Sequence, residues 1–411
     1  MSDSSSRRIP IAVAQNIRVQ RPGEIRFTAL PPLSLYVHVP WCVRKCPYCD
    51  FNSHEFSSST EHVLPDENRY LDALRADLEY VLPSVWGRRV HTIFIGGGTP
   101  SLLSARGLDR LLADIRARLP IDADAEITLE ANPGTFEVER FAQYRASGIN
   151  RLSIGIQSFD DACLKRLGRI HGRDEALRAT EIAATLFDNF NLDVMYALPG
   201  QSLQACEDDL RTALSFKPPH LSVYQLTLEA NTVFAKYPPE LPNDDLSAHM
   251  QETVEAMTAD AGMRHYEVSA YAQPGRSSRH NLNYWTFGDY IGIGAGAHGK
   301  ISFPDRIVRE VRYKQPASYM EACERGESVV ERSEIAADEL GFEFMLNALR
   351  LRDGVAAHVF EERTGVSLSR IHREIQVATQ KGLLAPDPTR LQPTALGRRF
   401  LNDLQALFLR D

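Results

Sequence analysis

The sequence lacks any long hydrophobic run. No stretch approaches the roughly 18–20 consecutive apolar residues that a membrane-spanning helix needs. The polar, serine-rich first residues carry two arginines, and no apolar core of a signal peptide follows them. We therefore expect a cytoplasmic protein without a transmembrane segment.

An excess of positive charge is also missing. The chain has 54 acidic and 46 basic residues and a formal net charge of −8. Such a balance repels phosphate backbones, which argues against general nucleic-acid binding. The hydrophobic share of 43% is ordinary for a globular protein.

Cysteine is scarce, with six residues in 411, too few for a disulfide framework. Cys163, Cys206 and Cys323 are scattered, and we expect them to be small buried hydrophobic residues. The other three lie within residues 42–49 in a C-x3-C-x2-C spacing. This cluster needs a chemical explanation.

Three thiolates in one short loop suit an iron–sulfur cluster, because soft sulfur ligands favour it. Structural zinc normally takes four ligands. Cys42, Cys46 and Cys49 would leave one iron of a [4Fe–4S] cluster open to the amino and carboxylate groups of S-adenosylmethionine (SAM). His54 is an alternative fourth ligand for zinc, so a zinc site remains the competing interpretation.

Short β-branched runs alternate with longer amphipathic stretches after the first 33 residues. The expected strands are Ser34–Val39, Val90–Ile95, Glu126–Glu130, Arg151–Ile156, Asn191–Tyr196 and Leu221–Leu226. The expected helices are Asn68–Leu82, Ala105–Leu119, Glu137–Ser147, Glu175–Phe187, Leu203–Phe216 and Asp244–Ala261. This order predicts an α/β fold, a partial (β/α)6 barrel whose sites gather at the carboxyl ends of the strands.

The pattern becomes purely helical near residue 336. The helical stretches are Ala336–Leu351, Val355–Thr364 and Ser367–Lys381, followed by a hairpin over Leu383–Pro393 and a last helix. We expect an N-terminal extension (1–33), the barrel (34–300), a less regular connecting segment (301–335) and a helical, winged-helix-like domain (336–411). DNA binding by that domain is disfavoured, because Glu374 adjoins its basic residues and fold alone does not establish function.

A glycine run, Gly96-Gly-Gly-Thr99-Pro100, follows the second expected strand. It is either a plain turn or a loop whose backbone approaches a ligand closely. Polar residues recur at or after the ends of the later strands, namely Glu130, Gln157 and Arg169, and Asp193 lies inside the strand Asn191–Tyr196. Each residue alone is ordinary. Together they provide hydrogen-bond acceptors for the hydroxyl and amino groups of SAM and a guanidinium for its carboxylate.

From about Leu33 onward the sequence resembles the oxygen-independent coproporphyrinogen III oxidase-like radical SAM family. The resemblance lies in the segments Tyr36–Cys42, Gly96–Pro100, Leu129–Pro133, Gly155–Phe159 and Asp193–Gln201. It implies cluster ligation by the three clustered cysteines. It also implies SAM contacts from Tyr36, Tyr48, Gly97, Gly98, Thr99, Glu130, Gln157, Arg169 and Asp193. Oxidases of the family can bind a second SAM, so these residues need not all contact one molecule.

The family contains oxidases and heme chaperones. This sequence departs from the oxidase pattern at one position that distinguishes the two groups. The oxidase pattern places Gly-Cys after the third ligand, whereas Cys49 is followed by Asp50-Phe51. This sequence is similar to the chaperone branch, as are the segments His280–Trp285 and Asp289–Gly299.

A heme site fits the chemistry of the first of these segments. Neutral imidazole is a common axial ligand of heme iron, which makes His280 the candidate, and Tyr284 and Trp285 could pack against a porphyrin. The alternative is that His280 only packs within a polar loop. His298 is a second, lower-ranked candidate.

The resemblance thus predicts a heme chaperone that carries a [4Fe–4S] cluster and exchangeable SAM. It would bind heme and pass it to an acceptor hemoprotein, and a homodimer is compatible with the family. The rival functions are a coproporphyrinogen III dehydrogenase, which would decarboxylate propionates oxidatively, and a zinc-dependent winged-helix regulator.

Overall fold

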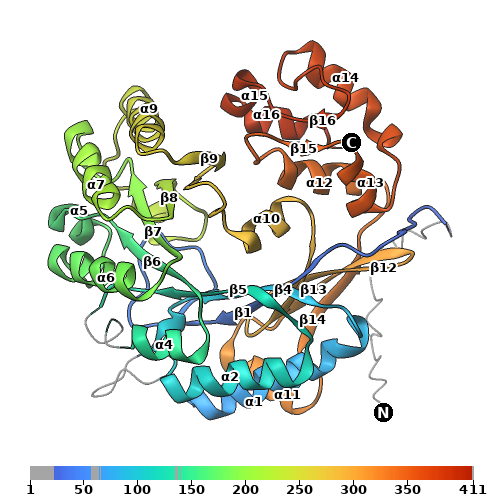
Figure 1. The fold of residues 1–411 in the computed structure, drawn as a ribbon, viewed down its shortest axis with the longest axis horizontal. Helices are drawn as coiled ribbons and strands as arrows, with labels where there is room; N and C mark the ends of the chain where they lie inside the picture. Colours follow the sequence, from blue (N-terminus) through green and yellow to red (C-terminus); the bar gives the residue numbers. More distant parts are fainter. Residues whose placement is uncertain (1–22, 57–63, 65, 135–137, 139, 410–411) are drawn as a thin grey trace, which may run out of the picture.

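The computed structural model describes residues 23–56, 64, 66–134, 138 and 140–409. Six parallel strands form its central part: β1 (Leu33–Val39), β4 (Val90–Gly97), β5 (Ile121–Ala131), β6 (Arg151–Gln157), β7 (Phe190–Tyr196) and β8 (His220–Gln225). They lie side by side in this order, as expected for the partial (β/α)6 barrel, and the sheet is open rather than closed (Figure 1).

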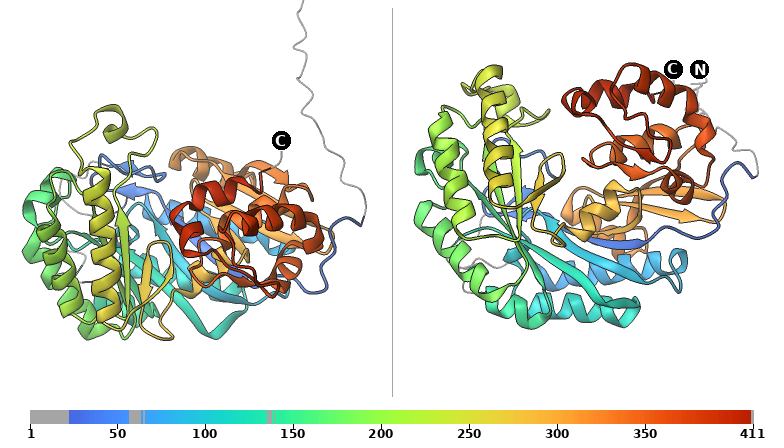
Figure 2. Two further views of the ribbon diagram at one scale, coloured as in Figure 1. Left: turned by 90° about the horizontal axis from the view of Figure 1, so that it is seen from above. Right: turned by 45° about the horizontal axis from the view of Figure 1, so that its top comes forward.

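Helices cover the convex face of this sheet (Figure 2). They are α1 (Glu67–Val81), α2 (Ala105–Arg118), α4 (Phe141–Ser147), α5 (Asp161–Arg166), α6 (Arg173–Leu186), α7 (Leu203–Ser215) and α9 (Asp244–Asp260). The short α5, which begins after the N-cap Asp160, was not expected. The expected helix over 137–147 includes residues outside the described part of the chain.

Side-chain alternation along the strands separates the two faces. Leu129 and Leu192 are fully buried in the main core, whereas Glu130 and Asp193, their neighbours in the chain, line a cavity on the opposite face. The main core therefore lies between sheet and helices, and the concave face carries polar groups.

Further strands extend the sheet on both sides. Beyond β1 lie β11 (Asp289–Ile293), β12 (His298–Phe303), β13 (Arg306–Arg312) and β14 (Val329–Glu334), and beyond β8 lie β10 (Ala270–Ala272) and β9 (Arg264–Glu267). The prediction of a less regular connecting segment over 301–335 was therefore wrong. That segment contains two strands of the main sheet and the helix α11 (Pro316–Glu324).

A C-terminal domain follows, with its own core. Its helices are α12 (Leu340–Ala348), α13 (His358–Thr364), α14 (His372–Gln380), α15 (Ala395–Arg399) and α16 (Leu401–Ala406). The predicted helix over 355–364 was wrong at its start, because β15 (Val355–Ala356) pairs there with β16 (Arg390–Leu391). The predicted last helix is divided into α15 and α16.

The described end of the expected N-terminal extension packs against this domain. Ile25 is buried in the C-terminal core, and the amide of Arg26 donates to the carbonyl of Gly365 at 2.9 Å. Residues 23–33 are therefore not a loose tail.

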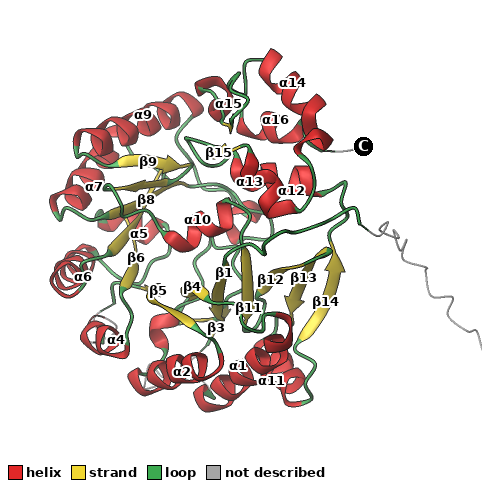
Figure 3. Ribbon diagram, turned by 45° about the vertical axis from the view of Figure 1, so that its right-hand side comes forward, coloured by secondary structure: helices red, strands yellow, loops and turns green. Residues whose placement is uncertain are grey.

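The C-terminal domain also reaches the far edge of the sheet. Leu351 forms an antiparallel bridge with Glu267 of β9, and the amide of Arg352 donates to the carbonyl of Tyr266 at 3.0 Å. The helix α10 (Arg279–Trp285) lies between the concave face and this domain (Figure 3). Among the described helices, none has the length and apolarity to cross a membrane.

Candidate cluster site and ligand cavity

The cysteine loop begins where β1 ends. Cys42 lies in β2 (Trp41–Cys42), which pairs with β3 (His54–Glu55) and so closes the loop. The amide of Cys49 donates to the carbonyl of Cys46 at 3.1 Å. All three clustered cysteines are partly exposed free thiols, whereas the three scattered ones are buried, as expected.

The glycine run packs directly on this loop. The amide of Gly98 donates to the carbonyl of Val39 at 2.8 Å, and the amide of Thr99 donates to that of Trp41 at 2.7 Å. A Cβ atom on Gly98 would lie only 2.5 Å from the Trp41 carbonyl oxygen. Gly97 has φ +121°, which favours glycine. The glycines therefore allow close contact between two loops of the protein.

A cavity of about 370 Å³ opens beside the cysteines at the carboxyl ends of the strands. It brings together most of the residues expected at the site: Cys42, Cys46, Tyr48, Cys49, Gly97, Gly98, Thr99, Glu130, Gln157, Arg169 and Asp193. Tyr36 and His280 lie outside its lining.

Two carboxyl groups of this cavity are buried deeply enough to raise their pKa values. Burial raises the pKa of Glu130 to about 8, and the nearby charge of Asp193 adds to the effect. The amide of Gly97 donates to Glu130 at 3.0 Å. Burial also raises the pKa of Asp193, which accepts hydrogen bonds from Asn191 and Ser153. Glu130 is therefore largely protonated near neutral pH in the protein alone.

Arg169 points toward the cysteine loop. Its guanidinium donates to Cys46 Sγ at 3.5 Å, to Asn132 Oδ1 at 2.7 Å and to the Gly155 carbonyl at 2.9 Å. Gln157, at the end of β6, has φ +68°, a strained conformation for a residue with a side chain. The hydrogen bonds hold Arg169 at the cavity wall, and Gln157 lies at the same wall.

Several cavity residues were not predicted, among them Asn132, Ser153, Met195 and Tyr224. Ser153 and Met195 each lie two residues from another lining residue on the same strand. The two-residue period of β6 and β7 could have identified them. Asn132 lies within the predicted Leu129–Pro133 motif, but the sequence carries no signal for its contacts.

Tyr36 faces the interior near the cavity without lining it. Its hydroxyl lies 2.9 Å from His38 Nδ1, and its ring stacks on Phe94 with centroids 6.2 Å apart. Burial raises the pKa of the Tyr36 phenol, so the group is neutral.

His280 lies toward the amino ends of the strands, away from the cysteines. Its Nδ1 is 2.9 Å from Thr92 Oγ1, and its ring lies 5.1 Å from that of Phe94. Its main-chain amide donates to Glu126. Burial lowers the pKa of His280 to about 3, so the imidazole is neutral, which is the form that ligates metal.

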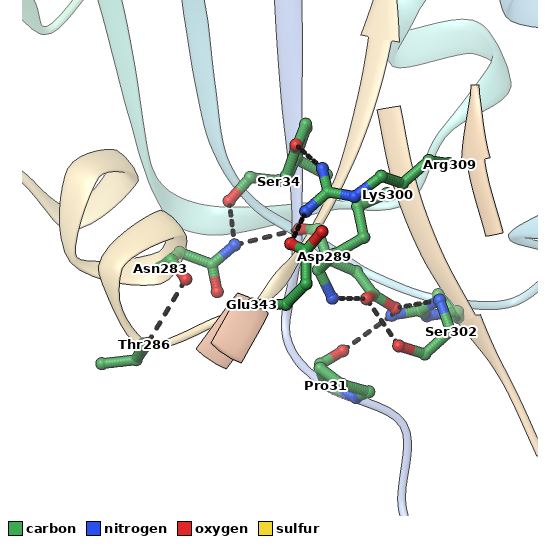
Figure 4. Close-up of polar contacts among 11 residues, drawn as sticks. Pro31, Ser34, Asn283, Thr286, Asp289, Lys300, Ser302, Arg309 and Glu343 are labelled. Atoms are coloured by element: carbon green, nitrogen blue, oxygen red, sulfur yellow. Dashed lines mark hydrogen bonds and ion pairs between the residues drawn. The ribbon is translucent and has the colours of Figure 1, made fainter. Parts of the chain in front are cut away.

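A buried polar network anchors α10 (Figure 4). Asn283 donates to Ser34 Oγ at 2.8 Å and to the Asp289 carbonyl at 3.0 Å. The Asp289 carboxylate in turn accepts from Lys300 at 2.9 Å and from the Ser302 amide at 2.9 Å. The helix carrying His280 is thereby fastened to β1 and β11.

The two aromatic residues that end α10 lie against each other. The Tyr284 ring meets the edge of the Trp285 ring, with centroids 5.1 Å apart. Tyr284 is 38% exposed, whereas Trp285 packs against the core of the C-terminal domain, so only one of the two rings is at the surface.

The zinc interpretation finds no support in the position of its proposed fourth ligand. His54 Nε2 lies 3.1 Å from the Lys314 carbonyl and so bonds to main chain. His298, the second heme-ligand candidate, is exposed at the start of β12.

Comparison with known proteins gives a consistent assignment. The family model of the radical SAM superfamily matches residues 36–213, and that of the HemN C-terminal domain matches residues 335–400. The chain is 48% identical over 384 residues to the heme chaperone HemW of Escherichia coli strain K12, covering 93% of this chain and 99% of the relative. It is 34% identical over 384 residues to HemW of Bacillus subtilis strain 168, covering 92% and 99%.

The fold is similar to that of coproporphyrinogen III oxidase (HemN) from Escherichia coli, described as a radical SAM enzyme. The TM-score is 0.78 at 23% identity, covering 92% of this chain and 90% of that one. This likeness concerns the fold. The curated relatives and the family model show that the chain belongs to the radical SAM superfamily and, within it, to the HemW family.

Proposed function

We propose that this chain is a cytoplasmic heme chaperone, which binds heme and passes it to an acceptor hemoprotein. The observation that carries the proposal is the 48% identity, over nearly the whole chain, to a relative named heme chaperone HemW. Asp50 and Phe51 agree with it, because they stand where the oxidase pattern has Gly-Cys.

Membership of the radical SAM superfamily implies a [4Fe–4S] cluster and SAM. We assign the cluster to Cys42, Cys46 and Cys49, because these free thiols line the cavity and thiolate is the usual ligand. When bound, the cluster and SAM supply one-electron reduction of the SAM sulfonium.

We assign SAM to the cavity beside these thiols, whose size and polar lining suit a small zwitterion. The residues proposed to hold it are Tyr48, Gly97, Gly98, Thr99, Glu130, Gln157, Arg169 and Asp193. Protonated Glu130 can donate as well as accept a hydrogen bond. Tyr36 does not line the cavity, and we propose that it supports the SAM-binding residues indirectly, through its contact with His38.

We propose His280 as the axial heme ligand, supported by its neutral imidazole and by the aromatic end of α10. Its ring packs against Thr92 and Phe94 of β4, so heme binding to it requires α10 to move relative to the sheet. A homodimer is also proposed, on the basis of the family resemblance alone.

The test of function is anaerobic turnover of the reconstituted chain with SAM, a reductant and coproporphyrinogen III. We expect an intact cluster and no protoporphyrinogen, together with transfer of bound heme to an apo-hemoprotein. Stoichiometric formation of protoporphyrinogen and 5′-deoxyadenosine would instead establish the oxidase.

The ligand assignment has its own test. His280→Ala should weaken heme binding and change the heme spectrum while leaving the iron content of the cluster unchanged. His249→Ala is the matched control, because it removes an exposed imidazole from α9, away from both heme-ligand candidates. An unchanged heme spectrum in His280→Ala would remove His280 from the proposal.

A further inference from the structure

A chain of side-chain hydrogen bonds joins two of the three clustered cysteines. On one side, Thr99 Oγ1 donates to Cys42 Sγ at 3.6 Å and accepts from Asn132 Nδ2 at 3.0 Å. On the other side, Arg169 donates to Asn132 Oδ1 at 2.7 Å and to Cys46 Sγ at 3.5 Å. Asn132 is therefore the central link between the two sulfur atoms.

The chemistry of its neighbours fixes the orientation of the Asn132 amide. The guanidinium of Arg169 has only donors, so it must face the amide oxygen. The Thr99 hydroxyl has one hydrogen, which it gives to Cys42, and so it accepts from the amide nitrogen. A flipped amide would place donor against donor. In this arrangement both ends of the chain donate to sulfur.

The backbone of β6 lies in contact with this link. Asn132 directly follows β5, and Gly155 of β6 lies beside its contact with Arg169. A Cβ atom on Gly155 would lie 3.5 Å from Asn132 Oδ1 and 3.6 Å from Arg169 Nη2. The Gly155 carbonyl also accepts from Arg169 at 2.9 Å. The strands on either side therefore hold Asn132 and Arg169 in place.

We propose that Asn132 is a positioning residue, which holds Thr99 and Arg169 as hydrogen-bond donors to Cys42 and Cys46 and so raises the reduction potential of the cluster. Donors to ligating sulfurs stabilise the more negatively charged, reduced cluster. This inference rests on the proposed assignment of the cluster to the three cysteines.

The test is the midpoint potential of the reconstituted full chain, measured anaerobically by spectroscopically monitored redox titration. Asn132→Leu should move the potential to more negative values while iron and sulfide per chain stay the same. Thr99→Val should also lower it. In the Asn132→Leu background, Thr99→Val should have a smaller effect, because the two residues act in one chain. Unchanged potentials, or fully additive shifts, would overturn the proposal.

A second variant keeps the test valid if leucine disturbs the loop. Asn132→Asp preserves the shape and the acceptor for Arg169. The Thr99 hydroxyl must then donate to the new carboxylate instead of to Cys42. We again expect a more negative potential and a smaller effect of Thr99→Val. An effect of Thr99→Val as large as in the parent would contradict the proposal.

Asn150 provides the matched structural control. Its side-chain oxygen accepts from the Ile127 amide and its side-chain nitrogen donates to the Ala125 carbonyl, both at 2.7 Å. Both partners lie earlier in β5, away from the cysteines. Asn150→Leu should lower the melting temperature and leave the potential unchanged. If the midpoint potential falls together with the melting temperature in both asparagine variants, Asn132 has only a structural role. A parent chain that takes up no [4Fe–4S] cluster would instead refute the cluster assignment itself.

Discussion

The guanidinium of Arg350 lies 4.3 Å from the centre of the Trp285 ring. Arg350 belongs to the C-terminal domain, and Trp285 ends the helix that carries His280. The same guanidinium approaches Glu267 of β9 at 3.4 Å. One side chain thus connects the C-terminal domain with both α10 and the edge of the sheet.

Removal of this contact should loosen α10. A partly desolvated cation–π pair contributes on the order of 1–2 kcal/mol. We expect Arg350→Ala to increase amide hydrogen exchange in α10 and to lower the melting temperature. Arg373→Ala, which removes an exposed arginine of the same domain, is the control. Unchanged exchange in α10 would show that the contact does not fasten the helix.

The cysteine assignment predicts a sharp contrast between two substitutions of the same kind. Cys46→Ser should abolish the charge-transfer absorbance and the bound iron of the reconstituted chain, because it removes a soft ligand. Cys163→Ser should retain both, because Cys163 is buried away from the cavity lining. Equal iron content in the two variants would contradict the assignment.

Glu130 should make the protein less stable as the pH rises. Its pKa in the folded protein, about 8, is above its value in the unfolded chain, so stability is lost as the pH rises toward and through about 8. Glu130→Gln has no such loss. In SAM-free protein, its stability relative to the parent should therefore increase by at least about 1 kcal/mol from mildly acidic to mildly alkaline pH.

Urea denaturation at several pH values would measure this difference. The exposed carboxylate of Glu79, which pairs with Arg118 at the surface, provides the control variant Glu79→Gln. A parallel pH profile for Glu130→Gln and the parent would show that Glu130 ionises normally.

The buried Asp289 carboxylate should be essential for stability. Burial alone would raise its pKa, yet Lys300 and Arg88 outweigh burial and hold the pKa below its usual value. Asp289→Asn would leave the fully buried Lys300 without its counter-charge, at a cost of about 3–5 kcal/mol. Asp305→Asn, at an exposed ion pair with Arg306, should change the free energy of unfolding little.

The parallel strands could be predicted from the sequence because their apolar runs are buried by helices on one face. The start of β5 could not. Asp122 and Asp124 interrupt the apolar pattern, and the strand begins at Ile121 instead of Glu126. Regular structure in 301–335 was missed for a related reason. β13 contains Arg312, whose guanidinium is buried against Asp77 of α1, and sequence patterns read such a charge as surface.

The site was predictable where chemistry depends on residue type and spacing. The spacing of Cys42, Cys46 and Cys49 identified the cysteine loop, and the polar residues of the later strands identified part of the cavity lining. Contacts between loops were not predictable. Asn132 acquires its partners only when the loops after β4 and β5 and the segment after α5 meet. The distance of His280 from the cysteines likewise depends on how α10 packs.

The outer strands of the twelve-stranded sheet are β14 and β9. β14 exposes the charged side chains of Glu331, Arg332 and Glu334, and β9 is bridged through Glu267 by Leu351. Aggregation by strand addition needs a flat, free and apolar edge. The charges of β14 and the bridge at β9 therefore disfavour strand addition at either edge of the open sheet.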